Sequence, residues 1–478
     1  MKEKLVRIEE FKWKIPEETS KKMKVPAYIF ATDEMIETIS KDRSLLQLMN
    51  VTTLPGIQSH ALVMPDVHEG YGFPIGAVAA TDLDEGVISP GGIGYDINCG
   101  IRLLTTDINK KDIKNYIKKV SSEIYNAVPS GVGKSGLMKL STKELDRVLN
   151  DGCKWAEKEG YTRTNDTEFI ESRGHLKTAN SSNVSNEAKE RGRDQLGTMG
   201  AGNHFIEIDF VEKVFDSDDA KIYNLSEGQI VLLIHTGSRG LGHQVATDYI
   251  RLMTRSLKKY QIDLPDIELA CAPFNSDEGK SYFAAMSAAA NFAWVNRQII
   301  TFQIRNSWEK VFGKTSKVNI LYDVAHNIAK IERHLINENE KEVIVHRKGA
   351  TRAFPPDHPE IPTKYRKVGQ PVLIPGSMGT KSYVLAGQEA SMRESFGSAC
   401  HGAGRLLSRT AAKKNIPVES LLNDLASKGI LIQTGSMKGV TEEAPQAYKN
   451  VEQVVDVVCR ANIAKRIARL KPIAVIKG

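Results

Sequence analysis

Short apolar runs alternate along this chain with longer segments of helical periodicity. The runs VLLIH, VNILYDV, EVIVHR, PVLIPG and PIAVIKG are typical of buried strands, because each is brief and contains Val or Ile. Residues 112–128, 142–159, 241–260, 283–312, 402–414 and 451–470 instead predict helices. The alternation predicts an α+β fold, in which compact mixed sheets are surrounded by helices.

A single domain over residues 1–478 is the simplest organisation. The 478 residues, 41% of them apolar, can bury one large core or a few ordinary ones. No internal repeat, low-complexity tract or long linker rich in Pro, Gly and Ser divides the chain. The polar segment at about 161–195, which carries clustered arginines, is expected to form an exposed excursion.

The composition favours a cytoplasmic protein without a membrane partner. The charged N-terminal MKEKLVRIEEFKWKIPEE lacks the apolar core of a signal peptide, and the small-residue stretch 283–295 is too short and polar to span a bilayer. Five scattered cysteines, none paired as CxxC, suit reduced thiols. The net charge of +7 permits a nucleic-acid partner without requiring one.

The loop GYDINCG, residues 94–100, places Asp96 three residues before Cys99 in a glycine-rich setting. A carboxylate and a thiolate at this spacing can reach one divalent ion, and the thiolate favours Zn²⁺, Mn²⁺ or Fe²⁺ over Mg²⁺. A turn aspartate followed by a buried structural cysteine explains the same pattern. Two ligands alone leave both interpretations open.

Three histidines strengthen the metal interpretation. His204 lies in GAGNHFIEID, His235 in VLLIHTGSRG and His326 in YDVAHN, so each adjoins a glycine-rich or apolar stretch. Together with Asp96 and Cys99 they supply five ligands, which exceeds one tetrahedral shell and indicates two ions that share the thiolate. Each histidine taken alone is equally well explained as an ordinary loop residue.

Glycine-rich turns supply candidate anion sites at the ends of predicted strands. GSRGLGH, residues 237–243, precedes a predicted helix and offers backbone N–H groups together with Arg239. PGSMGTKS, residues 375–382, offers Ser377 and Ser382 to a phosphate but lacks the spacing of a P-loop. Ordinary turns are the alternative for both.

SACHGAGR, residues 398–405, places His401 among small residues, where we expect it to precede a helix directly. An imidazole nitrogen can attack phosphorus and form a reactive phosphoramidate. The alternative is a helix-terminal histidine that only hydrogen-bonds. MPDVHEG, residues 64–70, adds Asp66 and His68, either of which can orient another imidazole.

Taken together and in order, these motifs closely resemble those of the RtcB family of RNA ligases. The matching blocks are MPDVHEGYGFPIG, GGIGYDINCG, LGTMGAGNHFIE, HTGSRGLGHQ, AAMSAAANFAWVNRQ, YDVAHN, HRKGATRAF, PGSMGTKSYVL and FGSACHGAGR. The resemblance extends from Met64 to Lys477. Ordered blocks of this kind are far more specific than any single glycine motif.

The resemblance implies a catalytic domain that joins a 2′,3′-cyclic phosphate or 3′-phosphate RNA end to a 5′-hydroxyl RNA end. It implies GTP and two Mn²⁺ ions as cofactors, a histidine-GMP intermediate, an activated RNA-3′-pp-5′-G end, and an archease-type activator as partner. The process would be tRNA splicing or RNA repair. Contact between RNA and the 161–195 segment is a further expectation.

The resemblance also implies a role for each matching residue. His401 is the nucleophile and Asp66 orients it, while Cys99 bridges two manganese ions. Asp96 and His204 complete one ion's ligands, and His235 and His326 complete the other's. The residues expected to bind GTP are Asn203, Phe205, Glu207, Ser377, Ser382, Gly404, Tyr448 and Lys477. The resemblance further implies phosphate-binding roles for four residues, Arg239, Asn327, Lys348 and Arg405.

Two alternatives remain at this point. A di-metal phosphodiesterase that only opens cyclic phosphates would need the five metal ligands and would leave His401 unused. A non-catalytic, GTP-regulated RNA-binding protein would need basic clusters and no thiolate-centred metal set.

Overall fold

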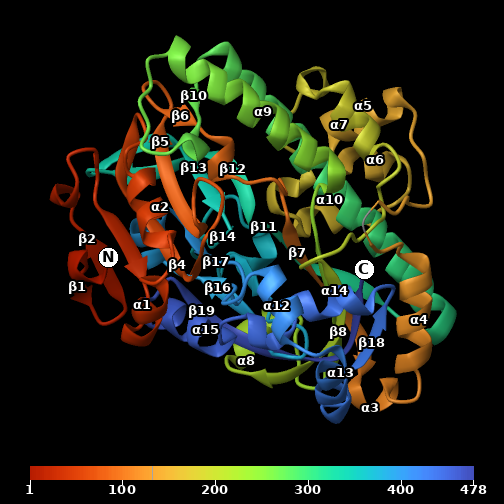
Figure 1. Cartoon of the computed structure of the whole chain (residues 1–478). Helices are drawn as coiled ribbons and strands as arrows, with labels where there is room; N and C mark the ends of the chain where they lie inside the picture. The colour runs from red at the N-terminus through yellow and green to blue at the C-terminus, as the bar shows by residue number, and fades with distance from the viewer. Residues whose placement is uncertain (132) are drawn as a thin grey trace.

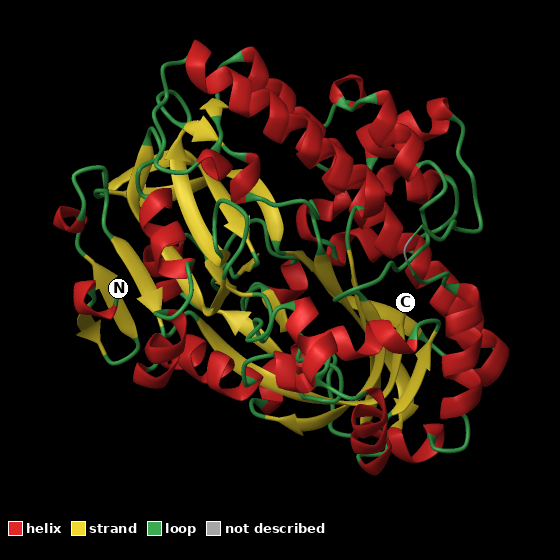
Figure 2. Cartoon of the chain, in the orientation of Figure 1, coloured by secondary structure: helices red, strands yellow, loops and turns green. Residues whose placement is uncertain are grey.

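The computed structural model describes residues 1–131 and 133–478, and two large sheets organise them (Figures 1 and 2). The seven-stranded sheet has the order β1 (Val6–Glu9), β2 (Lys12–Ile15), β3 (Ala27–Phe30), β4 (Ile57–His68), β5 (Ile75–Asp82), β13 (Asn339–Lys348), β12 (Asn327–Ile336). The eight-stranded sheet has the order β11 (Val318–Ala325), β7 (Gly100–Asn109), β9 (Gln229–Thr236), β8 (Phe205–Val214), β19 (Ala464–Lys477), β16 (Ser382–Gly387), β15 (Pro371–Ile374). The predicted combination of mixed sheets and surrounding helices is confirmed.

Short strands and helices complete the fold. β18 (Leu431–Thr434) runs parallel to β19, β10 (Ala272–Pro273) pairs with β6 (Val87–Ile88), and β14 (Ala350–Arg352) pairs with β17 (Ser398–Cys400). The helices are α1 (Asp33–Ile39), α2 (Ser44–Val51), α3 (Lys110–Ile113), α4 (Ile117–Ala127), α5 (Thr142–Asp151), α6 (Cys153–Lys158), α7 (Asn186–Gly192), α8 (Ser217–Ile222), α9 (Arg239–Lys259), α10 (Asp277–Phe312), α11 (Ala390–Ser395), α12 (Arg409–Asn415), α13 (Val418–Ser427), α14 (Met437–Glu442) and α15 (Val451–Arg460).

Helix α10 is the longest helix described, and α9 runs beside it along one side of the molecule (Figure 1). The helix begins before the predicted residue 283 because the Ser276 hydroxyl caps it, accepting a hydrogen bond from Gly279 N at 3.1 Å. Its middle is buried on all sides, yet it includes polar and charged side chains. Within the described part of the chain, no helix combines the length and apolarity needed to cross a bilayer.

Two predicted helices were wrong in extent. The segment 451–470 is helical only as far as Arg460; Asn462 then adopts a left-handed φ of 55°, and the remainder belongs to β19. Pairing on both sides, with β8 and β16, outweighs the local helical periodicity. The segment 402–414 is a loop up to Ser408, whose side chain caps α12. His401 therefore does not directly precede a helix.

The predicted helix 142–159 is divided at Gly152, which has a φ of 55° and separates α5 from α6. The polar segment that follows forms the short 3₁₀ helices Asp166–Phe169, Glu171–Gly174 and Ser181–Asn183, and then α7. Ile170 and Glu171 are buried, and the Glu171 carboxylate accepts a hydrogen bond from Ala325 N at 2.9 Å. Parts of this segment are therefore integrated with β11, while Arg173 and Arg191 remain at the surface.

A buried guanidinium on α10 ties together β11, the end of β9 and the loop before β7. Arg297 contacts both oxygens of Asp323 on β11, at 2.8 and 2.9 Å. The same side chain donates to the carbonyl of Asn98 at 2.9 Å and to that of Thr236 at 2.8 Å. Both Arg297 and Asp323 are fully buried. The start of β7 and the end of β9 are thereby fixed next to β11.

We expect Arg297→Met to lower the free energy of unfolding by about 3–5 kcal/mol, because it leaves the buried Asp323 charge without one of its partners. Urea denaturation followed by circular dichroism would measure the change. The control is Lys221→Met, which breaks an ion pair whose side chains are 77% and 89% exposed and which we expect to leave stability unchanged. Equal stability of Arg297→Met and the native chain would contradict the role assigned to this contact.

Candidate active site

The predicted metal ligands meet at one end of the eight-stranded sheet. Gly100 in β7 pairs with Thr236 in β9 and with Ala325 in β11, and Phe205 in β8 pairs with His235. Cys99, His204 and His326 each adjoin one of these paired positions in the chain. The antiparallel register therefore collects four of the five candidate ligands at the same sheet end.

Cys99 lies between two groups of ligands. Its Sγ atom is 3.2 Å from His235 Nε2 and 3.5 Å from His204 Nε2. His204 Nε2 is in turn 2.8 Å from the Oδ2 atom of Asp96. His204 therefore lies on the side of Cys99 occupied by Asp96.

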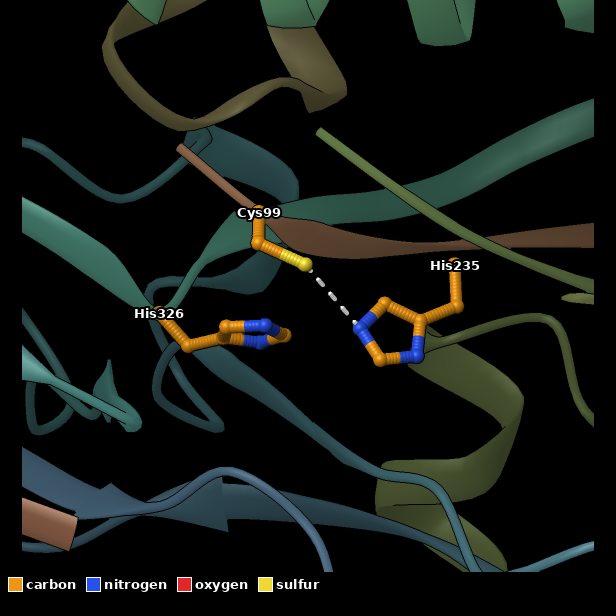
Figure 3. Close-up of side chains that lie close together, drawn as sticks. All are labelled: Cys99, His235 and His326. Atoms are coloured by element: carbon orange, nitrogen blue, oxygen red, sulfur yellow. Dashed lines mark hydrogen bonds between the residues drawn. The ribbon is translucent and has the colours of Figure 1, made fainter. Parts of the chain in front are cut away.

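The other group consists of Cys99, His235 and His326, whose side chains converge in Figure 3. In each group, Cys99–His235–His326 and Asp96–Cys99–His204, the potential ligand atoms lie within 4.8 Å of one another. Because Cys99 belongs to both groups, the described residues offer two adjacent metal positions with one shared sulfur. The structure thus brings the five predicted ligands together, and their binding of two ions stays a prediction.

The electrostatics of these groups suit bound cations. Burial, reinforced by neighbouring histidines, holds the pKa of His235 and of His326 well below the usual range, so both imidazoles are neutral and able to coordinate a metal. Burial and the nearby Asp96 raise the pKa of the Cys99 thiol well above its usual range. A divalent ion is the natural means of stabilising a thiolate here, and the donor set of one sulfur, one carboxylate and three imidazoles fits Mn²⁺, Fe²⁺ or Zn²⁺.

A histidine–aspartate pair lies beside the metal groups, with its aspartate on the seven-stranded sheet. His401 follows β17, and its Nδ1 atom is 2.6 Å from Oδ2 of Asp66, a fully buried residue on β4. Oδ2 of Asp66 also accepts the backbone N–H groups of His401 at 3.0 Å and Gly402 at 3.3 Å. The ring of His401 lies 5.0 Å from that of His326, centroid to centroid. The pair is therefore both rigid and adjacent to a metal ligand.

Gly404 permits this close approach of the His401 loop to β4. Its φ is +75°, and a Cβ atom at this position would lie 2.1 Å from the backbone oxygen of Asp66. Any side chain would therefore force the loop away from the strand. The sequence-based prediction placed Gly404 in the nucleotide site, and the structure also gives it this local packing role.

A cavity of about 370 Å³ lies between the two sheets and contains most of the predicted site residues in its wall. The wall includes Asp96, Cys99, His235, His326, His401 and the candidate nucleotide-binding residues Asn203, Phe205, Glu207, Ser377, Gly404, Tyr448 and Lys477. Ser382 lies behind the wall, where its hydroxyl accepts a hydrogen bond from Gly376 N at 3.0 Å. Asn327, Lys348 and Arg405 also line the cavity, whereas Arg239 instead donates to the Thr198 hydroxyl at 3.0 Å.

One end of the cavity contains a buried carboxyl oxygen, Oε1 of Glu207, without a hydrogen-bond partner among the described residues. Burial and the neighbouring Asp209 raise the pKa of Glu207, while Lys477 lowers it. Lys477 Nζ donates to the carbonyl of Gly202 at 2.6 Å. A ligand with N–H donors would satisfy the unpaired oxygen of Glu207.

Sequence reasoning missed Glu443, which is 3% exposed and lines the same cavity. Its carboxylate contacts the Tyr448 hydroxyl and lies 3.2 Å from the Arg405 guanidinium. Arg405 Nη1 also donates to the Tyr448 hydroxyl at 2.9 Å. The segment TEEAPQAY gives no periodic or motif signal for this contact, because it depends entirely on the meeting of distant loops.

These observations define a class of site: two adjacent metal positions sharing a thiolate, beside an aspartate-held histidine and a ligand cavity. A family model described as tRNA-splicing ligase RtcB matches residues 47–478. The chain is 53% identical to the tRNA-splicing ligase RtcB of Thermococcus kodakarensis and 52% identical to that of Aeropyrum pernix, each over 477 residues and 99% of both chains. The RtcB protein of Archaeoglobus fulgidus is 50% identical over the same length, with 99% of both chains covered. The chain belongs to the RtcB family.

If each ligand group holds one divalent ion, we expect Cys99→Ala to bind neither, because both groups use this sulfur. His326→Ala should lose mainly one ion, since it belongs to one group only. Equilibrium dialysis with Mn²⁺, followed by metal analysis, would measure the stoichiometry. Cys271→Ala is the matched control, since this cysteine is buried elsewhere in the core. Two ions retained by Cys99→Ala would refute the shared-sulfur arrangement.

Proposed function

We propose that this protein is an RNA ligase that joins a 2′,3′-cyclic phosphate or 3′-phosphate end to a 5′-hydroxyl end, with GTP and two Mn²⁺ ions. The observation that carries the proposal is the position of His401, which is held by Asp66 in the same cavity as the two metal groups. Family membership and the printed names of the relatives, tRNA-splicing ligases, point to tRNA splicing as the process. RNA repair is a second process that would use the same joining reaction.

The geometry suggests how His401 becomes the nucleophile. Its Nδ1 atom faces the Asp66 carboxylate, so Nε2 carries the lone pair. In the proposed first step Nε2 bonds to the α-phosphorus of GTP, and the bond to the bridging oxygen breaks as pyrophosphate leaves with the electron pair. Asp66 stabilises the positive charge that develops on the ring, as the aspartate does in other carboxylate–histidine pairs.

The remaining steps transfer the guanylyl group. A cyclic phosphate is first hydrolysed to the 3′-phosphate, which then attacks the histidine-GMP phosphorus and forms the RNA-3′-pp-5′-G end. Attack by the 5′-hydroxyl expels GMP and forms the phosphodiester. Bound Mn²⁺ would neutralise negative charge on the phosphates. Asn203 and Arg405, which line the cavity, offer hydrogen-bond donors to these phosphates.

The nucleotide fits the end of the cavity near Phe205 and Glu207. Oε1 of Glu207 can accept from the N–H groups of a guanine edge, and Phe205 can pack against the base. We assign Tyr448, Ser377, Gly404 and Lys477 to the same nucleotide, and Ser382 to the support of the loop containing Ser377. An archease-type activator and a cytoplasmic location complete the proposal.

The site disfavours the two alternatives. A phosphodiesterase limited to cyclic phosphates would use the metal groups but would have no need for a nucleophilic histidine with a buried aspartate. A non-catalytic RNA-binding protein would not need a buried thiolate among three histidines. The ligase reaction uses all of these features.

Transfer of label from GTP would test the nucleophile directly. We expect the native protein, given GTP labelled at the α-phosphorus and Mn²⁺, to retain acid-labile, base-stable label after denaturation. His401→Ala should retain none, and Asp66→Asn should label at least tenfold more slowly because the ring loses its charge partner. His175→Ala, which alters a partly buried histidine outside the cavity, is the control. Full labelling of His401→Ala would refute the assignment.

We place the RNA path over Arg191, Arg193 and Arg409, with the 161–195 segment along its side. Arg409 lines the cavity and its side chain is 56% exposed, which suits contact with a phosphate backbone. Replacing all three arginines with alanine should weaken RNA binding and make it less sensitive to salt, as measured by fluorescence anisotropy. An unchanged salt dependence would place the RNA elsewhere.

A further inference from the structure

His68 lies in the cavity wall but has no part in the steps described above. It is the last residue of β4, two positions after Asp66, and its side chain lines the cavity together with Tyr71 and Ile75. This wall belongs to the seven-stranded sheet, opposite Phe205 and Glu207 of the other sheet. His401 is near enough to lower the pKa of His68, so His68 lies close to the proposed nucleophile.

The hydrogen bond made by His68 fixes which nitrogen carries its proton. Nδ1 lies 3.0 Å from the backbone oxygen of Asp66. A carbonyl oxygen can only accept, so Nδ1 must carry the hydrogen. Burial, with repulsion from His401, lowers the pKa of His68 to about 3, so the ring is neutral. Nε2 therefore presents a lone pair.

Nε2 is an acceptor that the protein leaves unpaired. Among the described residues, the bond to Asp66 is the only hydrogen bond found for the His68 side chain. The flanking carbonyls already accept hydrogen bonds from Lys449, which donates to the oxygens of Pro65, at 3.1 Å, and Val67. Nearby Lys348 also points away, donating to the carbonyls of Tyr71 and Gly91.

A fixed, neutral acceptor in this wall selects for a hydrogen-bond donor on the substrate. Ionised phosphate oxygens and the ether oxygen of the ribose ring can only accept hydrogen bonds. Apart from the bases, the donors at RNA ends are therefore hydroxyl groups. Two such groups lie at the junction of the ends to be joined, the 2′-hydroxyl of the 3′ end and the attacking 5′-hydroxyl. Both hydroxyl groups can donate the hydrogen bond that Nε2 requires.

We propose that Nε2 of His68 accepts a hydrogen bond from a ribose hydroxyl at the RNA junction and thereby orients that end for joining. The inference rests on the proposed function and assigns a residue that the guanylyl-transfer steps do not use. The role is orientation, since a ring so reluctant to take a proton is a poor general base. The loss of His68 should therefore affect joining and not guanylylation.

The test compares His68→Phe, which keeps a ring but removes both nitrogens, with His68→Gln, which retains an acceptor. Single-turnover joining of pre-activated RNA-3′-pp-5′-G to a 5′-hydroxyl strand is the main readout, and labelling of His401 by GTP is the second. We expect His68→Phe to join about tenfold more slowly, and His68→Gln to remain within about twofold of the native rate. Labelling should be unchanged in both, which would show that the fold and the His401–Asp66 pair are intact.

A 3′ end lacking its terminal 2′-hydroxyl identifies the bonded group. If that hydroxyl is the donor, the native protein and His68→Phe join the deoxy end at equal rates; if the 5′-hydroxyl is the donor, the tenfold difference persists. Native joining rates in His68→Phe would overturn the proposal. A parallel loss of labelling in both variants would also overturn it, because His68 would then support His401 or the nucleotide. Failure of the native protein to label or to join would instead contradict the proposed function.

Discussion

The arrangement of the site depends on one buried guanidinium. Arg297 reaches from α10 into the end of the eight-stranded sheet, where it bonds Asp323 on β11 and the carbonyls of Asn98 and Thr236. Those carbonyls belong to the residues immediately before Cys99 and immediately after His235, and Asp323 lies three positions before His326. Burying such a charge is costly unless every donor is matched, and here Asp323 supplies the counter-charge. The contacts of Arg297 thus lie behind the candidate metal ligands and fix the spacing between them.

The two sheets contribute different chemistry to the cavity between them. The eight-stranded sheet supplies soft and neutral metal ligands, together with a buried carboxyl group at Glu207. The strands of the other sheet supply Asp66 and His68, and the short β17 leads to His401. Because these groups come from separate sheets, small shifts within one sheet do not disturb the internal geometry of the other. The relative position of the two sheets sets the distance from His401 to the candidate metal ligands.

Much of the site could be predicted from the sequence, because its residues lie in short motifs at strand ends. Asp96 and Cys99 share one loop, and each histidine follows or precedes an apolar run, so strand prediction alone places them at sheet edges. The convergence itself required the register of β7, β8, β9 and β11, which spacing along the chain does not specify. The roles of Arg297 and Glu443 could not be predicted, since each acts through partners far away in the sequence.

The errors in the fold have the same physical origin. Residues 464–470 have local helical periodicity, yet in β19 they gain hydrogen bonds from neighbouring strands on both sides. Residues 402–408 are drawn into a loop because Gly404 must approach the backbone of Asp66. In both cases a long-range contact outweighs the local preference, and a single sequence contains no direct record of such contacts. Helix 283–312, which has no such competitor, was predicted well apart from its capped start.

The position of β19 has a consequence for when the protein can work. This strand follows every other strand of its sheet along the chain, yet it lies in the interior, between β8 and β16. During synthesis it leaves the ribosome after all of them, so β15 and β16 have no central neighbour to join until it arrives. Lys477, at the end of the same strand, reaches the cavity only then. A nascent chain that already contains all five candidate metal ligands and His401 therefore still lacks the strand that completes the wall of the cavity.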